Sequence, residues 1–69
     1  MAEQNYIWQA TVNNKIKYYF STEQKAMEAI KRGGKILSHN AIDKSKQKIN
    51  LIDDLGFKLN IILRKLKLD

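Results

Sequence analysis

At 69 residues the chain has room for one domain, and without cysteine neither a disulfide nor a thiolate-bound metal can stabilise its fold. Its 43% hydrophobic content argues against disorder, while no apolar stretch approaches the about 20 residues of a membrane span or resembles a signal peptide. The net charge of +6 would attract nucleic acid or an acidic protein partner. We therefore expect one small, basic, cytoplasmic domain over residues 1–69, with a frayed start at residues 1–5.

Residues 6–20 predict a β-hairpin whose strand register follows from whether its loop has an odd or an even number of residues. Six apolar residues fall on one sheet face only if the loop has an odd number of residues, because side chains alternate between faces. A loop over residues 13–15 meets this condition, whereas a two-residue loop would pair Val12 with Lys15 and split the set. The inward set comprises Trp8, Ala10, Val12, Ile16, Tyr18 and Phe20. The outward set comprises Gln9, Thr11, Lys17 and Tyr19.

Residues 21–34 predict a helix that completes a hairpin–helix unit over residues 6–34. Ser21 and Gln24 have the spacing of a capping box, which satisfies two backbone donors at a helix start. An acidic residue in the first turn and two basic residues in the last favour the helix dipole. Gly33 fits the left-handed position that ends many helices. The charged residues are Glu23, Lys31 and Arg32, and the inward stripe is Ala26, Met27 and Ile30.

Part of this unit is similar to a known family. Trp8, the step Phe20-Ser21-Thr22, and the pair Ala26 and Ile30 resemble the end of the arm-type DNA-binding domain of phage and transposon integrases. The resemblance covers residues 8–30. That family has three strands before its helix, and this chain has room for two, so we infer no membership and transfer no site residues.

Residues 35–55 predict a third strand followed by a second helix. The strand, over residues 35–42, alternates imperfectly, with apolar residues at Ile36, Leu37, Ala41 and Ile42. Asp43 then fits the cap of a helix that runs to about Leu55, with Gly56 as its stop. The apolar face of that helix would carry Ile49, Ile52 and Leu55. The alternative is a strand over residues 47–53 and a turn over residues 54–56, and the pattern slightly favours the helix.

Residues 57–68 match both periodicities. Strand alternation fits Phe57, Leu59, Ile61 and Leu63, and helical spacing fits Leu59, Ile62, Leu63 and Leu66. The β-branched pair at 61–62 favours a strand, with a bulge near Arg64 or Lys65. The sequence therefore predicts an α+β domain of order β-β-α-β-α-β, with its helices packed on one face of a mostly antiparallel sheet.

The sequence offers no set of residues suited to catalysis or cofactor binding. His39 is the one histidine, and its neighbour Ser38 would point to the opposite face of a strand. Adjacent carboxylates at 53–54 do not converge on a cation. The glycines at 33–34 follow a helix rather than begin one, unlike those of a phosphate-binding loop. We therefore expect no enzyme, no cofactor and no metal.

Nucleic-acid binding is the function that the charge favours. Eleven of the thirteen cations are lysines, which predicts salt-sensitive contacts of low sequence specificity. A lysine-rich composition also arises from the coding bias of an AT-rich genome. The candidate residues are Lys17, Tyr19, Lys31, Arg32, Lys35, Lys44, Lys46, Lys48, Arg64, Lys65 and Lys67.

The alternative is a protein-interaction module, or a regulatory or inhibitor protein of phage or mobile-element origin. Residues 57–68 carry more apolar side chains than one buried face requires. As an edge strand they would support strand addition or a homodimer. The candidate interface residues are Phe57, Leu59, Ile61, Ile62, Leu63 and Leu66.

Overall fold

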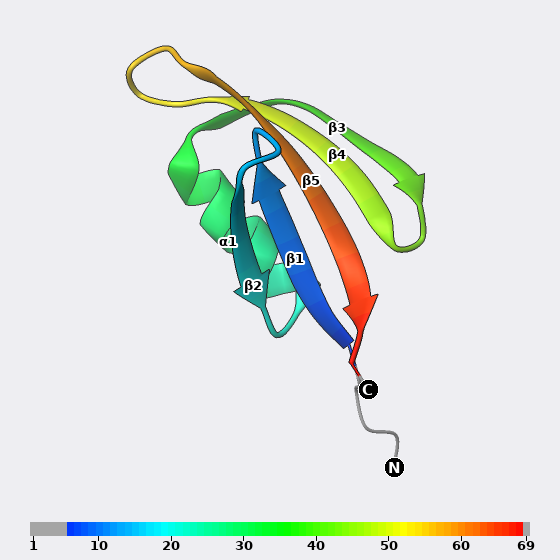
Figure 1. Ribbon diagram of the computed structural model, residues 1–69. Helices are drawn as coiled ribbons and strands as arrows, with labels where there is room; N and C mark the ends of the chain where they lie inside the picture. Colours follow the sequence, from blue (N-terminus) through cyan, green and yellow to red (C-terminus); the bar gives the residue numbers. More distant parts are fainter. Residues whose placement is uncertain (1–5, 69) are drawn as a thin grey trace.

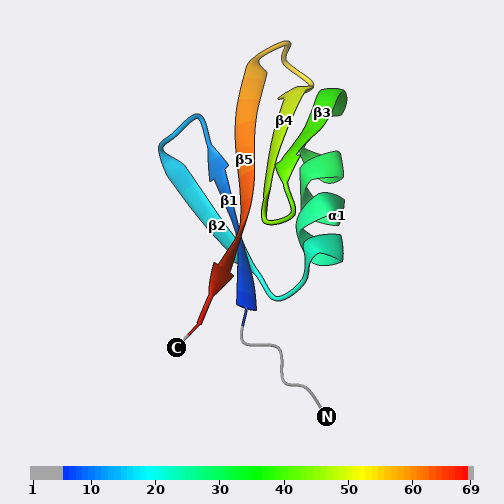
Figure 2. The same cartoon turned by 90° about the vertical axis from the view of Figure 1, so that its right-hand side faces the viewer.

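The computed structural model describes residues 6–68, so the expected fraying of residues 1–5 lies outside the described part. The elements in chain order are β1 (Tyr6–Val12), β2 (Ile16–Phe20), α1 (Glu23–Gly33), β3 (Lys35–Asp43), β4 (Lys46–Ile52) and β5 (Lys58–Lys67). The strands form one antiparallel sheet in the order β2-β1-β5-β4-β3 (Figure 1). Figure 2 shows α1 on one side of this sheet, which gives the fold two layers.

The expected order β-β-α-β-α-β is wrong, because residues 43–55 form a strand and two turns instead of a helix. Asp43 ends β3, and its Oδ1 accepts hydrogen bonds from the Ser45 backbone N–H at 2.7 Å and the Ser45 hydroxyl at 3.1 Å. An aspartate that fits a helix cap also fits such a turn, since both use the same carboxylate-to-backbone bond. Pairing of β4 with strands on both sides then favours the extended alternative.

The predicted hairpin register is confirmed. Val12 pairs with Ile16 across the loop at 13–15, and the pairing continues to Trp8 and Phe20. The Lys15 N–H donates to the Val12 carbonyl at 3.0 Å, which closes the turn. Asn13 and Asn14 have φ values of 52° and 60°, and asparagine tolerates this left-handed region better than most residues.

The predicted helix is confirmed, with its start displaced by one residue. Thr22, rather than Ser21, is the N-cap, and its Oγ1 accepts the Lys25 backbone N–H at 3.1 Å. Gly33 is the last helical residue and does not adopt the expected left-handed conformation, which among the described glycines occurs at Gly56 alone. The charged residues of the first and last turns stand as expected.

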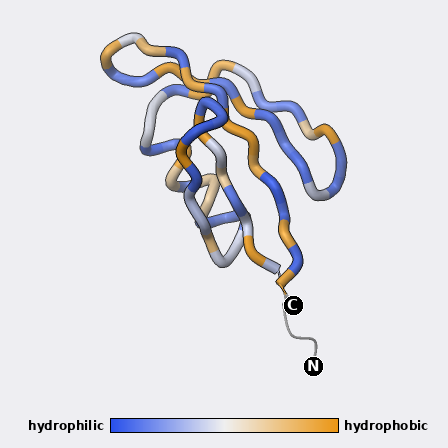
Figure 3. Tube along the Cα trace, in the orientation of Figure 1, coloured by the Kyte–Doolittle hydropathy of each residue, from blue (hydrophilic) through white to orange (hydrophobic). Residues whose placement is uncertain are grey.

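The core lies between α1 and the three central strands. Figure 3 shows hydrophobic and hydrophilic segments alternating along these strands, as one covered face requires. The buried apolar residues are Trp8, Ala10, Ala26, Ile30, Ile49, Leu51, Ile61 and Leu63.

The irregularities of the sheet lie in β3, and the bulge expected near Arg64 or Lys65 is absent from the β1–β5 register. The β3–β4 register shifts between Ile36 and Ser38 and again between Ala41 and Asp43. Each shift leaves one extra β3 residue, Leu37 and Ile42, and both side chains are exposed. The imperfect apolar alternation of residues 35–42 therefore reflects two bulges.

Candidate nucleic-acid interface

The sheet face opposite α1, here called the open face, is assembled by cross-strand pairing. Gln9 pairs with Tyr19 of β2 and Arg64 of β5, and Arg64 pairs with Lys46 of β4. Directly paired residues project to the same side of an antiparallel sheet, so these four side chains form one row. The adjacent row comprises Lys17, Thr11, Ile62, Lys48 and Asn40.

The open face concentrates positive charge. Six of its residues are cations, and they come from four of the five strands: Lys17, Lys35, Lys46, Lys48, Lys58 and Arg64. Among the strand residues of the described chain, Asp43 is the single carboxylate, and it lies at the end of β3 opposite Lys46. The backbone N–H and then the hydroxyl of Ser45 hold the pKa of the Asp43 carboxyl below its usual range, so it is ionised at neutral pH.

A shallow cavity of about 300 Å³ lies in this face. Three cations and several amide or hydroxyl groups border it, and no carboxylate does. Its lining residues are Gln9, Thr11, Asn14, Lys17, Lys46, Ile62 and Arg64. Such a border suits the oxygens of a phosphate group, which accept hydrogen bonds from ammonium, guanidinium and amide groups alike.

Gln9 supports this cavity from beneath. It lies on the predicted face but is buried, with 8% of its surface exposed. Its Nε2 donates a hydrogen bond to the Tyr19 hydroxyl at 3.1 Å. The Tyr19 ring is thereby fixed at the β2 side of the face, and its exposed surface is available for stacking on a base.

The other predicted nucleic-acid residues lie elsewhere. Lys31 and Arg32 are in the last turn of α1, and Lys44 is in the turn between β3 and β4. Lys65 and Lys67 pair with Trp8 and Tyr6, which places them on the α1 side of the sheet. The Lys65 Nζ lies 4.2 Å from the centroid of the Tyr6 ring.

Lys58 is a member of the open face that the sequence analysis missed. The apolar side chains of residues 57–68 dominate the pattern of this segment and obscure the spacing of its cations. Once a strand is assumed, however, the alternation of β5 groups Lys58 with Arg64 on the side away from the core. The signal was therefore present in the sequence.

The apolar interface candidates divide among three environments. Ile61 and Leu63 are buried in the core, and Leu59 packs against it. Ile62 and Leu66 are half-buried on the open face, and Phe57 is exposed before β5. β5 is the central strand with a partner on each side, so it is not the edge that strand addition to this segment would require.

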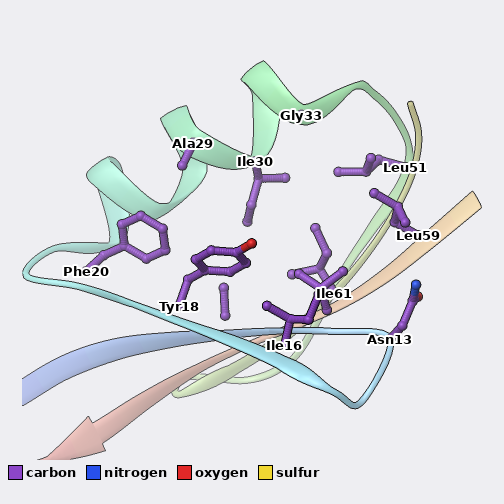
Figure 4. Close-up of a pocket in the computed structure, with 12 residues that line it drawn as sticks. Asn13, Ile16, Tyr18, Phe20, Ala29, Ile30, Gly33, Leu51, Leu59 and Ile61 are labelled. Carbon is purple, nitrogen blue, oxygen red and sulfur yellow. The ribbon is translucent and has the colours of Figure 1, made fainter. Parts of the chain in front are cut away.

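A second cavity, of about 450 Å³, lies between α1 and the β1–β2 hairpin. Figure 4 shows Ile16, Tyr18 and Phe20 pointing from β2 toward the helix around this space. Its walls are almost entirely apolar, because one short helix leaves part of the sheet uncovered. The walls include Ala10, Val12, Ala29, Ile30, Leu51, Leu59 and Ile61.

His39 forms part of a link between the edge of the sheet and the helix. Its Nε2 donates to Gln47 Oε1 at 2.6 Å, and Gln47 Nε2 donates to the Glu23 carboxylate. The amide separates the imidazole from the carboxylate, so the link positions α1 on β4 rather than forming a nucleophile–base pair. Within residues 6–68 no three acidic or histidine side chains gather in a metal-binding group.

No family model, curated protein or solved structure matches the chain. Residues 6–68 also contain no helix with the length and hydrophobicity needed to cross a membrane. What the protein does is therefore inferred from the chemistry of its own surface, of which the open face is the most distinctive part.

Proposed function

We propose that this is a non-catalytic, cytoplasmic protein that binds nucleic acid by laying its open face against the phosphate backbone. The supporting observation is the gathering of six cations on one uncovered sheet face, with a single carboxylate at its end. Cations occur in both layers, but the other carboxylates of residues 6–68 lie in α1 and in the β4–β5 turn. The open face is therefore a surface of nearly one sign, which attracts a polyanion over its whole length.

The cavity at the centre of the face supplies the closest contacts. Lys17, Lys46 and Arg64 border it from three strands, and neighbouring strands lie about 4.8 Å apart. Arg64 presents a planar fork that bonds two phosphate oxygens at once. Because it is the one arginine of the face, base-specific contacts are few, and affinity comes mainly from the release of counterions.

The test is binding to random duplex and single-stranded DNA at about 50 and about 200 mM salt. We expect affinity to fall at least about tenfold at the higher salt, because condensed ions are released on binding. The double variant Lys48→Gln/Arg64→Gln should bind more weakly and lower the slope of log affinity against log salt by about 2. Both side chains are exposed, so the fold should survive.

The matched control is Lys31→Gln/Arg32→Gln, which removes the same charge at the end of α1. It should retain most of the affinity and the salt slope. Equal losses in the two variants would mean that net charge, rather than the open face, drives binding. Absence of binding by the unaltered protein at the lower salt would refute the proposal.

A second candidate function is a protein-interaction or regulatory module. The turn between β4 and β5 supports it, because Leu55 and Phe57 are 81% and 63% exposed there. The Asp53 Oδ1 accepts the backbone N–H of each at 2.9 Å, so the turn presents these side chains in a fixed arrangement. In the DNA-binding assay, polyglutamate can be added as a competitor. If it displaces the bound DNA as strongly as competitor DNA of equal charge does, an acidic protein partner is favoured over nucleic acid.

A further inference from the structure

The two edge strands of the sheet, β2 and β3, differ in how well they are protected from pairing with a further strand. β3 carries two bulges, a feature that natural proteins use to block further strand pairing. β2 pairs with β1 in an unbroken register over all five of its residues. Its outer edge therefore offers a regular backbone for another strand.

Three of the five β2 side chains are apolar or aromatic and exposed, and Lys17 is the one charged residue of the strand. Ile16, Tyr18 and Tyr19 have 53%, 51% and 55% of their surface exposed. The apolar cavity of about 450 Å³ opens beside the same strand, with Ile16, Tyr18 and Phe20 in its wall (Figure 4). An exposed backbone edge next to uncovered apolar side chains is the usual setting for strand addition.

The sequence of β2 is complementary to itself. If two copies pair antiparallel about a two-fold axis at Tyr18, Ile16 faces the partner's Phe20, and Lys17 faces the partner's Tyr19. Apolar residues then meet on the α1 side, and on the open face each lysine meets an aromatic ring. An axis at Lys17 would oppose two lysines, and an axis at Tyr19 would leave Ile16 outside the strand pairing.

We infer that the β2 edge is a homodimer interface, with a second copy of this chain as its occupant. The axis is perpendicular to the sheet, so the two sheets join into one and both open faces lie on the same side. Five paired residues per copy is well below the roughly 20–30 residues per side of a standard interface, so a weak dimer is expected. The inference rests on the geometry of β2 and does not depend on nucleic-acid binding.

Single cysteines test the register directly, because the chain has none of its own. Directly opposed residues have Cα atoms about 4.5–5.5 Å apart, which is within reach of a disulfide. Tyr18→Cys should therefore oxidise to a covalent dimer at least about tenfold faster than Asn40→Cys on the β3 edge. A mixture of Lys17→Cys and Tyr19→Cys should form the mixed dimer in preference to either homodimer. Equal oxidation rates of the Tyr18 and Asn40 variants would overturn the inference.

Sedimentation tests the same interface without a covalent bond. At about 100 μM the unaltered protein should have an average mass above the 8.1 kDa of one chain. Tyr18→Lys opposes two cations at the axis and should return the protein to a monomer. Leu37→Lys is the control, since Leu37 lies on the β3 edge with the same 51% exposure as Tyr18. An unaltered protein that remains an 8.1 kDa species at this concentration would contradict the dimer.

Discussion

Asn13 extends the ladder between β1 and β5 by exchanging two hydrogen bonds with Asn60. The Asn13 backbone N–H donates to the Asn60 carbonyl at 2.7 Å, and the Asn60 N–H donates to Asn13 Oδ1 at 2.9 Å. The side chain thus replaces the backbone carbonyl that β1 no longer offers once it turns at φ 52°. One residue closes the first hairpin and connects it to a strand near the end of the chain.

Replacing this asparagine with glycine separates its two roles. Asn13→Gly keeps the positive φ but removes the acceptor of the Asn60 N–H, which should lower the free energy of unfolding by about 1 kcal/mol. Asn14→Gly, at φ 60°, is the control and should change it little. Urea unfolding measures both. Identical urea midpoints would show that the Asn13–Asn60 bond contributes nothing.

Gly33, the last residue of α1, and Gly34, which follows it, should respond in opposite ways to alanine. A Cβ at Gly34 would lie 2.2 Å from the Ile52 carbonyl oxygen and 2.9 Å from Leu51 Cδ1. The backbone must therefore shift, at a cost of about 1–3 kcal/mol. A Cβ at Gly33 meets nothing within 4 Å, and alanine in a helix is favoured by up to about 1 kcal/mol. Thermal unfolding should give a lower melting temperature for Gly34→Ala and an equal or higher one for Gly33→Ala.

The turn between β3 and β4 should weaken in acid. The Asp43 carboxylate accepts two hydrogen bonds from Ser45, which lower its pKa below the ordinary value of 3.8 in the native state. Because the native pKa is lowered, the ionised Asp43 carboxylate contributes to the free energy of unfolding above pH 3.8. This contribution is lost as the pH falls through the native pKa. In Asp43→Asn the free energy of unfolding should depend less on pH in this range. An unchanged pH profile would argue against these bonds.

Converting the buried amide of Gln47 to a carboxylate should destabilise the fold at neutral pH. Gln47→Glu replaces the donor to Glu23 with a second negative oxygen, at a cost of about 1–3 kcal/mol or more. Acid should restore part of the loss as the new carboxyl is protonated. The control is Asn50→Asp, an amide-to-acid change on the cationic open face, which should cost less. Chemical unfolding at two pH values compares the variants.

The first half of the chain was predictable because its constraints are local and agree with one another. The apolar residues alternate along both strands in residues 8–20, so only a loop with an odd number of residues places them on one face. The helix that follows has its own charge pattern and terminal glycines. Two details differ: the cap is Thr22 instead of Ser21, because two adjacent hydroxyl residues can both act as caps, and Gly33 ends the helix without a left-handed conformation.

The second half was not predictable in the same way, because its sequence fits two structures locally. Ile49, Ile52 and Leu55 have helical spacing, yet Gln47, Ile49 and Leu51 alternate as in a strand, and only pairing with β5 decides between them. The two bulges in β3 also hide its alternation. Grouping Lys17 with Lys46 and Arg64 required the strand order, since these cations are far apart in the chain and belong to three strands.

The mismatch in length between α1 and the strands makes stability uneven along the molecule. Eleven helical residues span about 16 Å, whereas the ten residues of β5 extend about 33 Å. The second half of β3 and the β4–β5 turn therefore have water around them rather than packed side chains. We therefore expect amide hydrogens there to exchange with solvent through fraying, and those at the middle of β1 and β5 to exchange only when the whole domain unfolds.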